Sequence, residues 1–250
     1  MKNKKNYSRI VILLILSILL IVPSQSAYAK TVNFNDYSLN QNSATTKVGQ
    51  ALNPSLGLGT NQTEYISNNK SYDWYIDQGY TGEYSDNNCG PSCTTMALKW
   101  INSNFTGTAE DARETYLENG NWWTTYDITN YFDLYSAKYN TINLNENSLK
   151  KSLQQGNIAI LCIDTTYLPY NANSEQRVGR FYDYKGGHFI VIKGYRIVDG
   201  KTYFESYDSN NWGMYYKNGE EKGKDRYYLA SDLMKAGNAN WNYAIIVHSK

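Results

Sequence analysis

Apolar residues recur with helical spacing in the first half of the region that follows residue 70. Four of them fall at i, i+3, i+4 and i+7 and predict a helix over about residues 89–102: Cys93, Met96, Ala97 and Trp100. A sequence that approximates a capping box, 108–111, opens a second predicted helix, which Gly120 ends. Two more helices are predicted, one capped by Thr125 and one over 146–155.

Strand patterns dominate the second half of the chain. Residues 158–163 and 188–197 are apolar runs typical of buried strands, 202–207 predicts a third strand, and 241–247 a closing strand after a short helix at 231–235. Helices that precede a set of antiparallel strands indicate an α+β protein, with a cleft between the helical half and the sheet half.

The first 29 residues match a secretory signal peptide. A start that contains lysine and arginine precedes the apolar run Ile10–Val22, and Ala27-Tyr28-Ala29 is a small-residue cleavage pattern. The run is 13 residues long, whereas a membrane-spanning helix needs about 20. We therefore expect a secreted protein, extracellular or associated with the cell wall, with no stable membrane insertion after the signal is removed.

Residues 30–70 are rich in Asn, Ser, Thr, Gly and Gln and show little periodicity. They predict an exposed arm, either disordered or similar to a pro-segment. The aromatic density that begins after Ser71 predicts a folded domain over 71–250.

Net charge and composition bear on which partners the protein can bind. A net charge of +1 gives no reason to expect nucleic acid. The 25 tyrosines fit surfaces that contact peptides or glycans, although they also fit the compositional habit of an exported protein. We expect a peptide or protein substrate and possible contact with the cell wall.

The chain contains three cysteines, which lie in different predicted environments. Cys89 stands at the start of the predicted helix in Cys89-Gly90-Pro91, where unpaired backbone N–H groups and the helix dipole stabilise a thiolate. Cys93 lies one turn further along, and Cys162 lies within a predicted buried strand. Cys89 is the candidate nucleophile, with its face to solvent; by itself it fits a structural cysteine near a turn equally well.

A cysteine nucleophile needs a base, and the chain has two histidines. His248 is two residues from the end of the sequence and is interpreted as a terminal residue. His188 follows Gly186-Gly187 and opens a strand, which places it at the sheet rim facing the cleft. His188 is therefore the candidate base.

Asp208 is the candidate that orients His188, with Asn210 and Asn211 as alternatives. A tight turn at Asp199-Gly200 would pair Val191 with Asp208 and turn Asp208 away from His188. The Cys89, His188, Asp208 triad thus requires a longer loop centred near residue 198, or a β-bulge.

An oxyanion in acyl transfer needs two hydrogen-bond donors. The backbone N–H of Cys89 can supply one, and the side-chain amide of Gln78 can supply the other; a solvent-exposed loop role for Gln78 is equally compatible. Asn87 and Asn88 are expected to shape the turn into the helix.

Together these motifs resemble the papain-like cysteine peptidases. The similarity is greatest to the bacteriocin-processing (double-glycine leader) peptidase-like family, peptidase family thirty-nine of the cysteine class, found among exported Gram-positive bacterial proteins. It rests on Gln78, Cys89-Gly90-Pro91, Gly187-His188 through Gly194-Tyr195, and Asp208. The resemblance implies a papain-like fold and a secreted thiol hydrolase that cleaves peptide or amide bonds. Ser209-Asn210-Asn211-Trp212-Gly213 departs from the Asp-Pro frequent in that group and keeps Asn210 open as the orienting residue.

Two other functions remain compatible with the sequence. One is a cell-wall amidase or endopeptidase similar to the NlpC and CHAP enzymes, and the other is a non-catalytic, tyrosine-rich binding module on the same fold. No cofactor is implied. A metal site at Cys89, Cys93 and His188 lacks the usual number of ligands.

Overall fold

The computed structural model describes residues 52–116, 120–171, 173 and 175–249. The predicted signal peptide and most of the predicted polar arm lie outside these ranges. Within them, no helix has the length and apolar character needed to cross a bilayer.

The helices begin close to where the sequence predicts them, but the second ends at Thr115 and not at Gly120. In chain order they are α1 Cys89–Ile101, α2 Ala109–Thr115, α3 Thr125–Leu134, α4 Glu146–Gln154 and α5 Ala230–Asn238. Thr108 caps α2 through a capping box with Asp111. The cap of α3 is Thr124, paired with Asp127, one residue before the threonine that the sequence indicates. Both caps give the first backbone N–H groups of a helix an acceptor.

A seven-stranded sheet forms the other half of the protein. Its strands are β1 Gln62–Ser67, β2 Tyr139–Asn143, β3 Ile158–Asp164, β4 Gly187–Val198, β5 Lys201–Tyr207, β6 Arg226–Leu229 and β7 Tyr243–Val247. The order is β2-β7-β3-β4-β5-β6, with β1 paired to β4. Every strand pair is antiparallel, which confirms the predicted α+β class.

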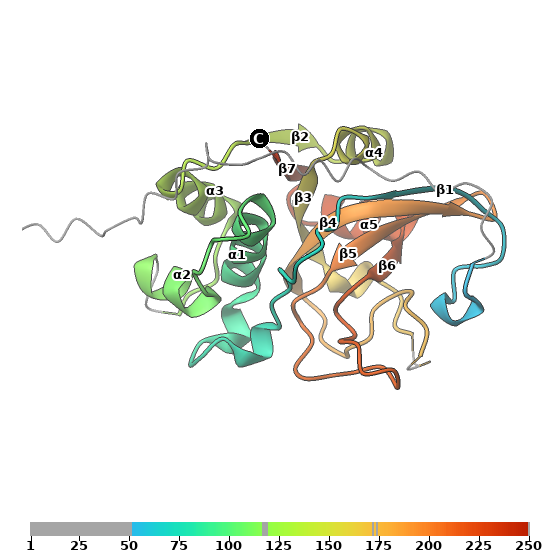
Figure 1. The fold of residues 1–250 in the computed structure, drawn as a ribbon, viewed down its shortest axis with the longest axis horizontal. Helices are drawn as coiled ribbons and strands as arrows, with labels where there is room; N and C mark the ends of the chain where they lie inside the picture. The colour runs from blue at the N-terminus through green and yellow to red at the C-terminus, as the bar shows by residue number, and fades with distance from the viewer. Residues whose placement is uncertain (1–51, 117–119, 172, 174, 250) are drawn as a thin grey trace, which may run out of the picture.

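Helices cover both faces of the sheet, with α1, α2 and α3 on one side in Figure 1. One cluster of buried residues joins α1 and α3 to alternate residues of the central strands, such as Ile160 and Val191. The intervening residues, such as Leu161 and Ile190, face a second cluster with α4 and α5. The runs at β3 and β4 are continuously apolar because both faces are buried.

Three strands were not predicted: β1, β2 and β6. β1 lies within the stretch expected to be a polar arm, yet it pairs with residues 194–198 of β4. The sheet therefore begins before Ser71, the predicted start of the folded domain. β1 and β2 are short and largely polar, with several exposed or half-buried residues, so they lack a strong alternating signal.

Candidate active site

Cys89 is the first residue of α1, as the sequence predicts. The first N–H groups of a helix have no partner within the helix, so the thiol stands at the positive end of the α1 dipole. Its burial differs from the expectation of a solvent-facing thiol: Cys89 is 2 % exposed. The helix is buried nearly all round because it packs between the sheet and the other helices.

The Arg113 side chain holds the residues that lead into α1. Arg113 of α2 donates from Nε to Oδ1 of Asn88 at 2.8 Å and from one terminal nitrogen to the Asn87 carbonyl at 2.9 Å. Burial lowers the pKa of Arg113, and the interaction with Cys89 opposes this shift. No sequence pattern indicates this guanidinium, which lies 24 positions after Cys89 (113 minus 89).

Close packing explains the glycine beside the thiol. A Cβ added at Gly90 would lie 2.7 Å from the Cβ of Trp123, closer than real Cβ contacts permit. Trp123 is buried against the helices, so it cannot withdraw easily. Gly90 therefore lets Trp123 pack directly against the first turn of α1.

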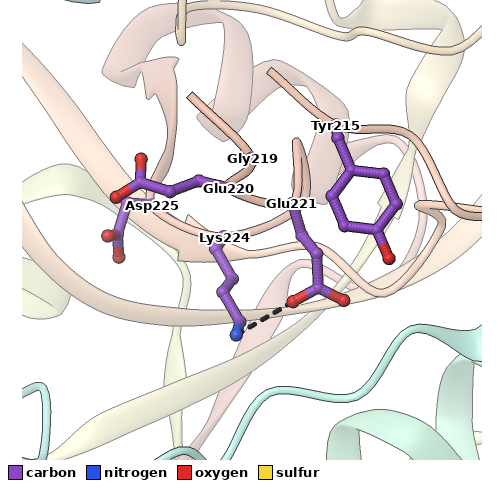
Figure 2. Close-up of a pocket in the computed structure, with 6 residues that line it drawn as sticks. All are labelled: Tyr215, Gly219, Glu220, Glu221, Lys224 and Asp225. Atoms are coloured by element: carbon purple, nitrogen blue, oxygen red, sulfur yellow. Dashed lines mark ion pairs between the residues drawn. The ribbon is translucent and has the colours of Figure 1, made fainter. Parts of the chain in front are cut away.

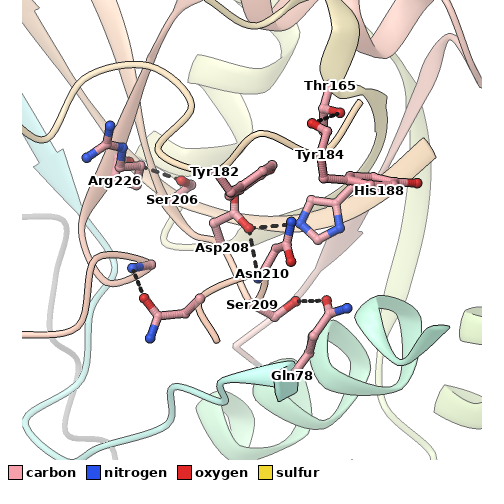
Figure 3. A network of polar contacts seen from close by, with 12 residues as sticks. Gln78, Thr165, Tyr182, Tyr184, His188, Ser206, Asp208, Ser209, Asn210 and Arg226 are labelled. Carbon is pink, nitrogen blue, oxygen red and sulfur yellow. Dashed lines mark hydrogen bonds and ion pairs between the residues drawn. The ribbon is translucent and has the colours of Figure 1, made fainter. Parts of the chain in front are cut away.

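His188 is the second residue of β4 and lies beside Asp208 (Figure 3). Both side chains are buried, whereas the sequence predicts a histidine that faces the cleft. Nε2 of His188 lies 2.8 Å from Oδ1 of Asp208. A carboxylate only accepts, so the Nε2–H donates and Nδ1 remains available on the other side of the ring. Cys89 is among the groups that raise the pKa of His188, which indicates that its thiol lies close to the ring. One imidazole thus joins the sulfur of the helical layer to the carboxylate of the sheet.

Electrostatics favour the charged form of this imidazole. Burial alone lowers the pKa of His188, but the Asp208 carboxylate and the hydrogen bonds to Asp208 and Cys89 outweigh it and raise the pKa to about 10. For Asp208, burial raises the pKa, and the charge and hydrogen bond of His188 bring it below its ordinary value. At neutral pH the pair is therefore imidazolium and carboxylate.

A β-bulge brings Asp208 to the face of His188. The turn between β4 and β5 is the tight one that the sequence indicates, with positive φ at both Asp199 and Gly200. The register then shifts between Ile192 and Gly194, so that Val191 pairs with Tyr207 instead of Asp208. One extra residue reverses which side chains share a face. Of the two geometries that the triad required, the structure has the bulge.

The alternative orienting residues have other partners. The Asn210 backbone N–H donates to Asp208 Oδ1 at 3.1 Å, and the Asn210 side chain accepts from the Trp212 indole at 2.6 Å. The Asn211 side chain bonds to Asp77 and to the backbone of Gly223. His188 is therefore paired with Asp208 and not with either asparagine.

Gln78 lies beside the loop that follows β5 and contains Ser209. Its Oε1 accepts from the Ser209 hydroxyl at 3.1 Å, and its Nε2 donates to the Ser85 carbonyl at 3.0 Å (Figure 3). An amide nitrogen carries two hydrogens, so a second donor remains on Nε2. Gln78 is 4 % exposed rather than a surface loop residue.

The other two cysteines belong to the core. Cys93 is fully buried, and burial raises the pKa of its thiol well above the ordinary range. Burial also raises the pKa of Cys162 to about 12. None of the three cysteines forms a disulfide. Cys93 and Cys162 therefore stay protonated at neutral pH.

A polar cavity of about 520 Å³ lies in the loop that joins β5 to β6 (Figure 2). Its charged lining residues are already paired: Lys224 lies 2.9 Å from Glu221, Asp225 lies 2.7 Å from Lys193, and Glu220 pairs with Arg177. The cavity includes neither Cys89 nor His188. It offers little uncompensated charge for a ligand.

Two solved structures are similar to this chain at low sequence identity. A putative C39-like peptidase from Bacillus anthracis is 15 % identical with a TM-score of 0.47, over 70 % of this chain and 94 % of that one. A digestive procathepsin L2 from Tenebrio molitor larval midgut is 16 % identical with a TM-score of 0.36, over 70 % and 67 %. No curated protein matches. The sequence model of the Peptidase_C39 like family matches residues 74–234, which is 161 of the 250 residues, and the chain therefore belongs to that family.

Proposed function

We propose that this protein is a secreted thiol hydrolase that cleaves a peptide or amide bond. The observation that carries the proposal is the position of His188, which bonds to Asp208 through Nε2 and interacts with Cys89 closely enough for the thiol to raise its pKa. Membership of the Peptidase_C39 like family supports the same chemistry. Secretion rests on the signal-peptide pattern at the start of the sequence.

The first half of the reaction forms an acyl enzyme. The Cys89 thiolate attacks the carbonyl carbon of the substrate and forms a C–S bond, and the carbonyl oxygen becomes an oxyanion. The Cys89 N–H and the remaining Nε2 donor of Gln78 stabilise this charge. His188 gives its proton to the leaving amine as the C–N bond breaks, and Asp208 keeps the ring in orientation.

The second half releases the product. His188, now neutral, takes a proton from a water molecule, which attacks the thioester carbonyl. The C–S bond then breaks, the acid product leaves, and the thiolate and imidazolium pair is restored. Electrons and protons balance without any group beyond substrate and water.

The decisive experiment uses a peptide-like electrophile directed at thiols, followed by mass-spectrometric mapping of the labelled residue. We expect labelling at Cys89 near neutral pH and none at Cys93 or Cys162, whose thiols remain protonated. Cleavage of a peptide mixture is expected to be lost in Cys89→Ala and His188→Ala.

Cys93→Ala is the matched control, because it removes a thiol from the same helix, one turn away. It should cleave peptides at close to the wild-type rate. An inactive Cys93→Ala together with an active Cys89→Ala would overturn the assignment. A Cys89 alkylation rate that follows an ordinary thiol across pH would instead favour a non-catalytic binding module.

A further inference from the structure

The carboxylate of Asp208 accepts more hydrogen bonds than an orienting aspartate needs. Oδ1 accepts from His188 at 2.8 Å and from the Asn210 backbone at 3.1 Å. Oδ2 accepts from the hydroxyls of Tyr182 at 3.0 Å and Tyr228 at 2.5 Å. The two oxygens thus have separate partners, which fixes both the position and the plane of the carboxylate.

The two tyrosines reach Asp208 from different parts of the fold. Tyr182 belongs to the loop that precedes β4, and Tyr228 lies in the middle of β6. Their exposed fractions are 6 % and 1 %. Tyr182 also packs edge to face against the His188 ring, with centroids 6.0 Å apart (Figure 3). Water is excluded from Oδ2, and the hydroxyls take its place.

Such donors matter because Asp208 is fully buried. A buried carboxylate without partners would take up a proton instead of remaining charged. Burial raises the pKa of both Tyr182 and Tyr228 well above the ordinary range, so both remain protonated donors. The two hydroxyls therefore stabilise the carboxylate anion in place of water.

We propose that Tyr182 and Tyr228 are positioning residues of this site, whose hydroxyls hold Asp208 as an anion with Oδ1 turned toward His188. The proposal rests on the proposed function, in which Asp208 orients the base. Both tyrosines act through Asp208 and not by contact with the substrate.

The proposal has a defined electrostatic consequence. Each donor stabilises the His188 and Asp208 pair most when the histidine is neutral, because the carboxylate charge is then uncompensated. Removing a donor makes the protonated pair relatively more favourable and raises the pH at which the pair loses its proton. Other titratable or charged groups also act here: Cys89 interacts with His188, Cys93 and Tyr75 interact with Asp208, and Arg226 interacts with Tyr228.

The test compares Tyr182→Phe, Tyr228→Phe and the double variant with Tyr227→Phe. Tyr227 is the matched control, because it is also a buried tyrosine of β6 and its hydroxyl donates to a different carboxylate, Glu205, at 2.8 Å. Two readouts need no substrate: the NMR titration of His188, in a chain with only two histidines, and the pH dependence of iodoacetamide alkylation at Cys89.

We expect the double variant to raise the apparent pKa of the pair by about one pH unit, because hydrogen bonds to a charged group are strong but only part of their strength differs between the two protonation states. Each single variant should give a smaller rise, and Tyr227→Phe none. If the double variant does not fold, the single variants decide.

An unchanged titration in folded Tyr182→Phe and Tyr228→Phe, or an equal rise in Tyr227→Phe, would overturn the proposal. The outcome is separable from that of the proposed function. Wild-type peptide cleavage with no shift in the variants refutes only the positioning role, and a shift in a protein that cleaves no peptide refutes only the hydrolase.

Discussion

Replacing Asp208 with Asn tests the electrostatics of the site with little change of shape. Asn is nearly isosteric, so its Oδ1 can still accept from His188 and from the Asn210 backbone. Its Nδ2 would meet the hydroxyls of Tyr182 and Tyr228, which can rotate to accept. The principal change is therefore the loss of one buried negative charge.

Without that charge, burial dominates the titration of His188. The pKa of about 10 in the wild type depends on Asp208, because burial alone acts in the opposite direction. In Asp208→Asn we expect the pKa to fall below the ordinary value of about 6.5. The imidazolium that supports the Cys89 thiolate would then be a minor species at pH 7, and alkylation of Cys89 should slow by about tenfold or more.

The sign of the stability change with pH should also reverse. In the wild type the folded pKa of His188 exceeds the unfolded one, so its stabilisation is complete below about pH 6.5 and is lost as pH rises toward about 10. One proton accounts for about 1.4 kcal/mol per pH unit at most, so the wild type should lose up to about 2 kcal/mol between pH 6.5 and 8. In Asp208→Asn the folded pKa lies below the unfolded one, and stability should increase with pH up to about 7.

The assay is urea unfolding followed by tryptophan fluorescence at half-unit steps from pH 5.5 to 8. This range lies above the ordinary pKa of the carboxylates and below that of tyrosine. His248 titrates in the same range in both proteins, so the difference between the two slopes reports the effect of Asp208 on His188. Titration of His188 by NMR in the same two proteins provides the direct measurement. Parallel slopes of stability against pH in wild type and Asp208→Asn would refute the argument.

Two further substitutions probe the parts of the fold that build the site. Gly90→Ala places a Cβ 2.7 Å from Trp123. Overpacking costs about 1–3 kcal/mol, whereas the gain in helix propensity is about 1 kcal/mol. We therefore expect the free energy of unfolding to fall by up to about 2 kcal/mol and the alkylation of Cys89 to slow. An increase in Tm with unchanged alkylation would contradict this packing. Lys193→Met removes the cation that lies 2.7 Å from Asp225 and 3.4 Å from Glu205. Breaking a buried ion pair costs about 3–5 kcal/mol, and because Asp225 is 36 % exposed we expect the lower end, about 3 kcal/mol, in urea unfolding. The double variant that adds Glu205→Gln should recover part of this loss. A loss below about 1 kcal/mol would contradict the argument.

The helices and the central strands could be predicted because their signals are local. Helical spacing from Cys93 to Trp100 predicts α1, and the apolar run of β3 predicts a strand buried on both faces. The tight turn at Asp199-Gly200 also depends on two adjacent residues. These features follow from conformational preferences and burial periodicity, which the order of residues contains directly.

The pairing of His188 with Asp208 depends on a longer-range event. A strict hairpin turns Asp208 away, and the shift between Ile192 and Gly194 turns it back. The residue at the shift is a lysine whose buried ammonium pairs with Glu205 and Asp225. No local sequence pattern predicts this bulge, because its lysine pairs with Asp225, 32 positions further along the chain (225 minus 193).

The order of residues alone determined which groups could do chemistry: a thiol at a helix start, a histidine at a strand start, an aspartate after the next strand. Tertiary structure decided how those groups are tuned. Tyr182, Tyr228 and Arg113 reach the site from a loop, a strand and a helix that the sequence does not connect to it. Their effect is electrostatic and arises only after folding removes water from around the buried charges, because a hydroxyl or guanidinium influences a pKa strongly only at short distance in a dry interior.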